Sequence, residues 1–503
     1  MPVILHGNPT KRARRPLAAS WRLAAGHYVA AKMTPEIIGP SAATEAETDN
    51  AWSRYRRCPS AIAYRVPVAV LGGAYPFYYE LTTAPSGMAI GAQYGDTDYG
   101  IINWSNPTVG DHSIVVKVTD QDGTEVTRSW TLEVIDRENT TYFLFCDAAN
   151  GSDSTGDGSY SDPYQTFLGW YGVTPGATTG SGDITFPGRQ VFYRAGTYST
   201  SDVTDPSGVK FWINPARKPS VHVAYPGEAV TFDCPYYWSG MTGDFCASGI
   251  NWTGAGVDEG GLWRITYIRS DLDPDRNIIF ENVFDGEVGT PDGGSNTSTI
   301  MLDNNTSRDV VISHNTFHEP ATYILVYGVS YSVFQHNTLE PTGSTSEVNG
   351  AFLKSTGYDH WSIRANTGFG AIRPLTFQDG STGNLTDIEI CWNSYRMTTA
   401  NPALNYHQTT GTAGVGPFWV YRNSFSGSGE IEQMLGGSSL TSPVCTYEKN
   451  ILQGMTLGTD ATFTHTDDGT GTTTNCSGFL NATTNLLEGD GLAYRGTHGA
   501  EVA

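Results

Sequence analysis

The sequence contains few charged residues, and basic residues are especially scarce. Only 16% of its 503 residues are charged, and 29 Lys and Arg stand against 51 Asp and Glu, which gives a formal net charge of −22. A nucleic-acid partner is excluded, because phosphate binding requires clustered Lys and Arg that displace counterions. A neutral or anionic glycan remains compatible with this charge.

Cysteine is also scarce. The chain has seven cysteines with no CxxC pair, which excludes a zinc site of the common spacing, so we expect no metal and no cofactor. Cys234 and Cys246 are close enough in sequence for a local bridge, and the sequence leaves that open. The acidic loop from Asp153 to Asp157 departs from EF-hand spacing, so we interpret it as a turn and keep calcium as the minor alternative.

Long apolar runs are missing as well. No stretch approaches the roughly 18 apolar residues that cross a bilayer, so we expect no membrane insertion. A basic arm extends from Lys11 to Lys32. We expect it to contain no export signal, because Arg22 and His27 interrupt the apolar residues of 17–31. The arm either binds an acidic surface or is a solvated tail.

The composition favours strands. The 58 glycines and many Thr, Ser and Asn residues are typical of short strands joined by turns, and the chain divides into three segments. Residues 1–56 form an N-terminal arm or linker, and residues 57–137 show alternating strands at 64–70, 76–81, 100–104, 112–120 and 128–136, a small β-sandwich pattern. Through GGAYPFYYELTTAPSGMAI, GIINW and VTDQDG, this segment resembles immunoglobulin-like and cadherin-like modules, which implies a spacer without chemistry.

Residues 138–503 carry a repeat. An asparagine follows a short alternating strand at seven positions, with spacings of 22 to 33 residues: Asn282, Asn315, Asn337, Asn366, Asn393, Asn423 and Asn450. We expect each asparagine to occupy a left-handed bend and to bond its neighbours along a solenoid axis.

Apolar residues flank each asparagine at fixed distances. The residues three positions earlier are expected to face one core: Ile279, Ile312, Phe334, Ile363, Ile390, Val420 and Tyr447. The residues two positions later are expected to do the same, with Gly368 and Phe369 as one slipped register: Phe284, Phe317, Leu339, Tyr395, Phe425 and Leu452. The prediction is an all-β chain with a right-handed parallel β-helix, preceded by the sandwich and the arm. The phrases YFLFCDAANGSDSTGDGSYSDPYQTF and QVFYRAGTYS resemble the start of pectate-lyase-like β-helix proteins.

A polar stripe is predicted on the outside of the coils. Alternation places these side chains outward as substrate-binding candidates: Asp303, Tyr327, Lys354, Arg364, Gln378, His407, Trp419 and Tyr421. Aromatic faces and hydrogen-bonding groups together suit a sugar chain, although solvated strands carry the same residue types.

Asp379 and Glu389 are the nearest outward carboxylates, and we predict them as general acid and base of a glycoside hydrolase. The alternative is a lyase in which Lys354, Arg364 or His407 abstracts the proton next to a uronate carboxylate. An ordinary surface role remains open for each of these residues.

The whole arrangement resembles a bacteriophage tailspike. That resemblance implies a homotrimer assembled in the host cytoplasm, attached to phage tail or portal proteins through its N-terminal arm, which binds and is expected to depolymerise host surface polysaccharide. The Gly- and Thr-rich end, NLLEGDGLAYRGTHGAEVA, departs from the family because it is similar to a closing coil and not to a trimerising domain. A secreted bacterial polysaccharide lyase or glycoside hydrolase and a non-enzymatic virion fibre or decoration protein remain the alternatives.

Overall fold

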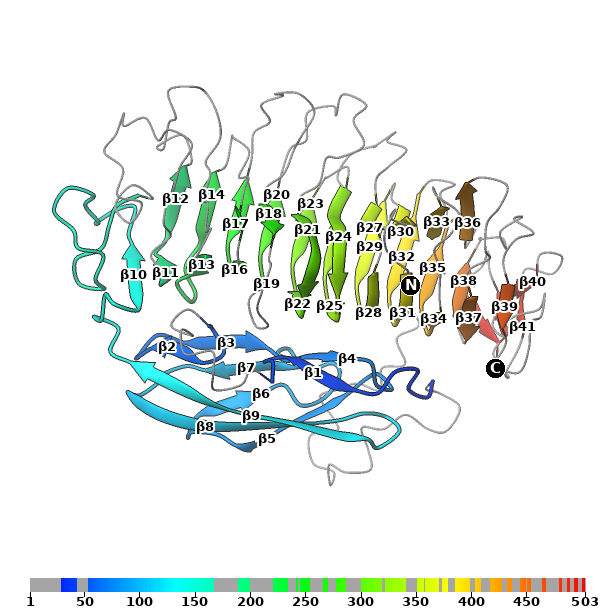
Figure 1. Ribbon diagram of the computed structural model, residues 1–503, viewed down its shortest axis with the longest axis horizontal. Coiled ribbons are helices and arrows are strands. Elements are labelled where there is room, and N and C mark those ends of the chain that lie inside the picture. Colours follow the sequence, from blue (N-terminus) through cyan, green and yellow to red (C-terminus); the bar gives the residue numbers. More distant parts are fainter. Residues whose placement is uncertain are drawn as a thin grey trace.

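A computed structural model gives the fold of the chain (Figure 1). It describes residues 29–42, 53–166, 189–199, 220–233, 241–242, 245–253, 266–269, 277–285, 300–318, 322–340, 351–356, 358–370, 373–378, 385–398, 403–408, 417–427, 432–436, 444–448, 450–453, 464–466, 479–481, 486–488, 493–495 and 500–502. Throughout these ranges every regular element is a strand, and no helix is long and apolar enough to cross a membrane.

Three parallel sheets form a β-helix, as the sequence predicts, because each coil adds its strands beside those of the coil before. Sheet I runs through β10 (Phe143–Cys146), β11 (Gln190–Tyr193), β13 (Ser220–Ala224), β16 (Phe245–Ser248), β19 (Asn277–Phe280), β22 (Val310–Ser313), β25 (Ser332–Gln335), β28 (Tyr358–Arg364), β31 (Leu385–Cys391), β34 (Phe418–Tyr421), β37 (Val444–Glu448) and β39 (Thr464–Thr466). Sheet II runs through β12 (Gly196–Ser199), β14 (Val230–Asp233), β17 (Asn251–Thr253), β20 (Val283–Asp285), β23 (Thr316–His318), β26 (Thr338–Glu340), β29 (Thr367–Gly370), β32 (Ser394–Met397), β35 (Ser424–Ser426) and β38 (Ile451–Gln453). Sheet III runs through β15 (Met241–Thr242), β18 (Thr266–Arg269), β21 (Ile300–Arg308), β24 (Thr322–Ser330), β27 (Ala351–Thr356), β30 (Arg373–Gln378), β33 (Leu404–Gln408) and β36 (Glu432–Gly436).

The recurring asparagines form one buried column at the corner between sheets I and II. The side-chain amide of Asn315 donates to Oδ1 of Asn337 at 3.0 Å, and the backbone N–H of Asn315 donates to the same oxygen at 3.1 Å. The same pair of bonds repeats from Asn282 to Asn450. Each of these amides also reaches a carbonyl of the preceding coil, as Asn315 does with Ile279 at 2.9 Å. The predicted stacking of the bends is therefore confirmed.

The left-handed bend lies one residue earlier than predicted. The residues with φ between 53° and 58° are those immediately before the asparagines: Glu281, His314, His336, Ala365, Trp392 and Arg422. The asparagine itself closes the bend through its amide hydrogen bonds. Asparagine is thus needed at this position because its side-chain amide satisfies buried donors and acceptors, and not because it tolerates the left-handed conformation.

The predicted inward residues pack into the interior of the β-helix. The residues three positions before each asparagine are fully buried from Ile279 to Val420, and the rings of Phe284 and Phe317 stack with centroids 5.0 Å apart. The side chains of Tyr447 and Leu452 lie outside the described residues. The predicted register slip at Gly368 is wrong, because Gly368 pairs directly with Leu339 and Tyr395 while Phe369 faces outward.

Two further sheets build an N-terminal sandwich. One consists of β2 (Arg57–Pro59), β9 (Glu125–Ile135), β8 (Gly110–Thr119) and β5 (Tyr78–Thr83), and the other of β3 (Tyr64–Pro67), β7 (Ile101–Trp104) and β6 (Met88–Ile90). Ile114 and Leu132 of the first sheet share one core with Val66 and Ile102 of the second. A separate pair, β1 (Glu36–Gly39) and β4 (Ala69–Leu71), is antiparallel. Part of the segment predicted as an arm is therefore folded structure.

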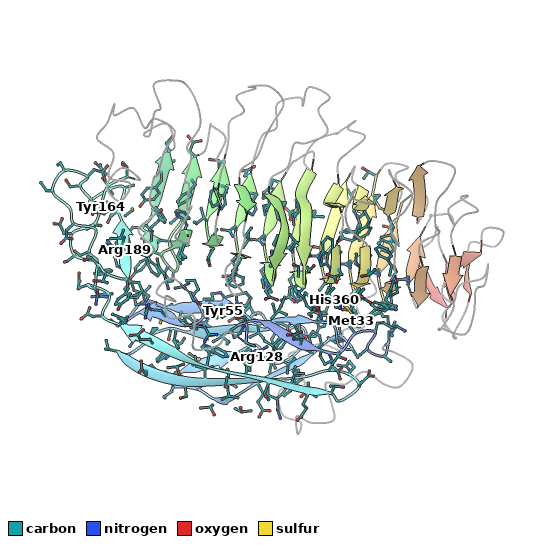
Figure 2. All side chains as sticks on the ribbon, viewed as in Figure 1. Met33, Tyr55, Arg128, Tyr164, Arg189 and His360 are labelled. Atoms are coloured by element: carbon teal, nitrogen blue, oxygen red, sulfur yellow. The ribbon has the colours of Figure 1, made fainter. Side chains whose placement is uncertain are left out.

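The sandwich lies lengthwise against the outer face of sheet I (Figure 1). Phe145, Phe192 and Phe280 of sheet I belong to the same apolar cluster as the sandwich core. Farther along the β-helix, Ile38 of β1 and Leu71 of β4 pack against Val311 and Val333 of sheet I. In Figure 2, Tyr55, Met33 and His360 lie along this junction. The sandwich is thus a cover on the β-helix and not the spacer that its resemblance implies.

The end of the chain also differs from the expected closing coil. A small antiparallel sheet is found there instead, and it consists of β40 (Phe479–Asn481), β41 (Leu486–Glu488), β42 (Ala493–Arg495) and β43 (Ala500–Val502). At the other end of the β-helix, Cys246 is a free, buried thiol, while Cys234 lies outside the described residues.

Candidate functional site

The predicted stripe on sheet I faces away from the β-helix interior, as expected, but it does not face solvent. Arg364 and Glu389 have no exposed surface and Tyr421 is 1% exposed, while Trp419 is half-buried. The sandwich covers these positions. The prediction that they bind a sugar chain from solvent is therefore wrong for Arg364 and Tyr421. Glu389, predicted as a catalytic carboxylate, has no access to a substrate in this arrangement.

These buried groups instead join the two domains. The Arg364 guanidinium donates to the carbonyls of Val70 and Gly72 in the sandwich, the latter at 3.3 Å. Glu389 accepts hydrogen bonds from Tyr421 and, at 2.8 Å, from Ser362, whose hydroxyl accepts in turn from the Gly72 N–H at 2.9 Å. Burial, together with the neighbouring Cys391 and Glu389, raises the pKa of Tyr421 well above its usual value.

The other predicted residues belong to sheet III or lie outside the described residues. The backbone register places Asp303 beside Tyr327 and Gln378 beside His407, whereas Lys354 pairs with Leu325 and Thr376, two residues away from that column. The side chains of these five residues lie outside the described residues, and so does Asp379. The predicted pair of Asp379 and Glu389 is thus not brought together by anything that the structure describes.

Sheet II carries a solvent-facing stripe on its outer face. Its residues stand in register on successive coils, which stack about 4.8 Å apart. One column consists of Asp285, His318, Glu340, Phe369, Arg396 and Ser426, and the column beside it consists of Thr316, Thr338, Thr367, Ser394 and Ser424. We call these two columns the outer stripe. None of its positions belongs to the predicted site.

The outer stripe combines an apolar platform with charged and hydroxyl groups. Phe369 is 51% exposed, and the Arg396 guanidinium lies over its ring at 5.2 Å from the centroid. On the two coils before that of Phe369, His318 Nδ1 lies 3.8 Å from Glu340 Oε2. In the column beside them, the Thr367 hydroxyl donates to the Thr338 hydroxyl at 3.4 Å. Exposed ring faces flanked by donors and acceptors are what a sugar chain contacts.

A sequence signal for the outer stripe existed. The residue three positions after each asparagine is His318, Glu340, Phe369, Arg396 and Ser426 in successive coils, a column of mostly polar residues opposite the buried position before it. The assumed slip at Gly368 hid it, because that assumption placed Phe369 in the core.

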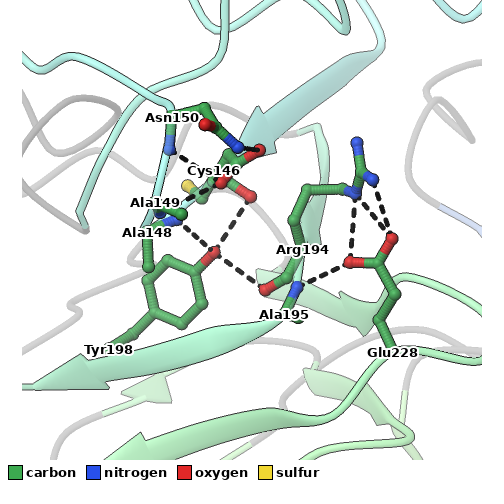
Figure 3. A network of polar contacts seen from close by, with 9 residues as sticks. Cys146, Ala148, Ala149, Asn150, Arg194, Ala195, Tyr198 and Glu228 are labelled. Carbon is green, nitrogen blue, oxygen red and sulfur yellow. Dashed lines mark hydrogen bonds and ion pairs between the residues drawn. The ribbon is translucent and has the colours of Figure 1, made fainter.

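A polar network links neighbouring segments of the first coils to one another (Figure 3). The Tyr198 hydroxyl bonds the Cys146 and Arg194 carbonyls, and Arg194 forms an ion pair with Glu228 at 2.8 Å. Asp147 accepts from the amides of Ala149 and Asn150; although burial acts in the opposite direction, hydrogen bonds from Asn150 and Ala149 hold the pKa of Asp147 below its usual value. This network fixes the start of the β-helix.

In the acidic loop considered for calcium, the carboxylates accept hydrogen bonds from backbone N–H groups of the same chain. Asp153 accepts from the backbone N–H groups of Gln165 and Thr166 at 2.8 and 2.9 Å, and Asp157 accepts from that of Ser159 at 2.9 Å. Within the part of the chain that the structure describes, no three His, Cys, Asp or Glu side chains are grouped to hold a metal ion. These hydrogen bonds hold the loop in its turn.

Comparison with known proteins identifies no family. No protein-family model and no curated protein matches the sequence. Among solved structures, the chain is similar to the catalytic domain of a family GH87 α-1,3-glucanase in complex with nigerose, with 10% sequence identity, coverage of 82% of this chain and 86% of that one, and a TM-score of 0.27.

Proposed function

We propose that the chain binds an extended surface polysaccharide along the outer stripe of sheet II. The observation that carries the proposal is the half-exposed Phe369 beneath the Arg396 guanidinium, set in a row of Ser and Thr hydroxyls. A half-exposed ring beside charged and hydroxyl groups can stack on the apolar face of a sugar while those groups bond its hydroxyls, which is the basis of the proposal. The regular spacing of the coils offers the same groups repeatedly to a chain-like ligand.

Binding is tested with the full chain on glycan arrays and on purified host capsule or lipopolysaccharide. Phe369→Ala and Arg396→Ala are expected to weaken binding at least about 10-fold, since each removes a stacking or charged contact. Val109→Ala, which shortens an exposed apolar side chain of the sandwich, is the matched control and is expected to bind as the native chain does. Equal binding by all four proteins would refute the outer stripe as the site.

We also propose, on the resemblance of the sequence to tailspikes, that the polysaccharide is depolymerised and that the protein is a homotrimeric component of a virion tail, assembled in the host cytoplasm and attached through its N-terminal arm. Release of reducing ends indicates hydrolysis, and release of unsaturated uronates indicates a lyase. Binding without either product leaves a receptor-binding protein without catalysis, and light scattering of the purified chain tests the trimer.

A further inference from the structure

Two histidines stack on each other at the contact between the sandwich and the β-helix. His314 and His336 occupy the left-handed bends of neighbouring coils, and their ring centroids are 4.7 Å apart with an interplanar angle of 22°. The Tyr75 hydroxyl of the sandwich lies 3.4 Å from His336 Nε2, and the Tyr99 ring meets His336 edge-on at 5.7 Å. Both domains therefore enclose the pair.

The surroundings of the pair favour the neutral imidazole. On the β-helix side, His314 bonds the Ser313 hydroxyl at 2.6 Å and packs against Phe280, while Arg364 lies near His336. On the sandwich side, Arg65 lies near His314, but its guanidinium is engaged by two carboxylates, Asp98 and Glu281, at 2.9 and 2.6 Å. Asp98 alone acts to raise the pKa of His314.

Burial, followed by the charge of Arg65, lowers the pKa of His314 to about 4. Burial, followed by the charges of His314 and Arg364, lowers the pKa of His336 well below its usual value. If the sandwich moves away, both rings become hydrated and their pKa values return to the ordinary range near 6.5.

We infer that the His314–His336 stack is an acid-sensitive latch, which holds the sandwich on sheet I while both rings are neutral and releases it when they are protonated. Two positive rings in face-to-face contact repel each other, and a protonated His336 Nε2 cannot accept a hydrogen bond from the Tyr75 hydroxyl. Release uncovers the polar end of sheet I, where Arg364, Glu389 and Tyr421 lie.

The direction and size of the pH effect on docking follow from the linkage between protonation and docking. Both groups have depressed pKa values when docked, so docking is fully supported above about pH 6.5 and weakens as the pH falls below it. For His314 alone, a pKa of about 4 when docked and about 6.5 when open weakens docking about 30-fold at pH 5. His336 adds to this in the same direction.

Hydrogen exchange of the full chain tests the latch, with rates corrected for the intrinsic pH dependence. The reporting peptides cover 72–79 and 94–100, which lie over the two histidines, and the reference region is 110–135, in the far sheet of the sandwich. When the pH falls from 7.5 to 5, exchange in the reporting peptides is expected to rise by at least about 30-fold relative to exchange in the reference region. No such rise, or an equal rise in all three regions, would overturn the inference, because the first means no release and the second means general unfolding.

Two variants separate the latch from other titrations. His336→Gln keeps a polar side chain facing Tyr75 but does not titrate, so the local pH response is expected to shrink. His318→Gln removes a half-buried histidine from the outer face of sheet II, away from the contact with the sandwich, and the pH response of the peptides is expected to match that of the native chain. If His336→Gln does not fold, the native chain still tests the inference, because the absence of a local rise in exchange at pH 5 would overturn it.

Discussion

At the scale of single residues, the asparagine column shows what sequence periodicity reveals and where it stops. The repeat predicts both the column and the buried positions three residues before it, because the column requires Asn and the buried positions require an apolar side chain at a fixed place in each coil. The left-handed position was not predictable. Glu281, Ala365 and Trp392 share no chemistry, and their conformation is imposed by the stacked coils around them.

Asn337→Ala is expected to destabilise the fold by about 2–4 kcal/mol, because two buried donors of Asn315 lose their acceptor, Oδ1 of Asn337. The Ile312 carbonyl and Oδ1 of Asn366 lose a donor at the same time. Urea unfolding followed by circular dichroism measures the change. Thr338→Ala, one residue on, serves as control, and an equal loss in both variants would show that the column contributes nothing special.

His222 gives the β-helix its own pH dependence, distinct from that of the latch. It is fully buried in sheet I, its Nδ1 lies 2.9 Å from the Tyr193 hydroxyl, and burial lowers its pKa to about 3. The neutral ring is required in the folded state, so stability is present above about pH 6.5 and is lost as the pH falls toward 3.

The loss attributable to His222 approaches about 4–5 kcal/mol near pH 3. His222→Gln is expected to be less stable at pH 7.5 but to show a flatter decline with acid in thermal unfolding. A native-like slope between pH 6.5 and 3 in this variant would rule out the assignment to His222.

At the scale of elements, strands of sheet I differ from those of sheet II in the residues they present outward. Strands buried on both faces carry mostly apolar residues, and β10, β11 and β22 read FLFC, QVFY and VVIS, with one polar residue in each of the last two. That pattern could have predicted a cover over the first coils. The polar outward residues of β28 and β31, Ser362 and Glu389, are typical of a solvated face, so sequence alone indicated solvent where the sandwich lies.

Paired charge substitutions distinguish the two faces. Val333→Asp places a carboxylate between sheet I and β4 without a partner, and we expect a loss of at least about 3 kcal/mol and faster proteolysis of the sandwich. Thr367→Asp places the same charge on the exposed face of sheet II, where we expect a change within about 0.5 kcal/mol. Equal tolerance of both substitutions, measured by urea midpoint, would show that the sandwich does not cover sheet I.

At the scale of the whole molecule, the two domains form one folded body. The sandwich contacts sheet I from Gln190, which accepts a hydrogen bond from Arg54 at 3.2 Å, to Tyr421, and it shares an apolar cluster along that length. The domain order was readable from the sequence, but the docking was not. It depends on pairs separated by more than two hundred residues, such as Arg65 with Glu281, for which a single sequence offers no pattern.

This docking predicts that the β-helix is not an independent soluble unit. A fragment of residues 138–503 exposes the apolar outer face of sheet I, including Phe145, Ile278, Phe280 and Val311, and is expected to bind a hydrophobic dye and to aggregate. Gel filtration and light scattering at several concentrations measure this. Replacing Ile278, Phe280 and Val311 by Thr in the fragment is expected to restore monodispersity, because Thr keeps the strand propensity and removes apolar surface. A native fragment that stays monodisperse and binds no dye would mean that sheet I does not need its cover.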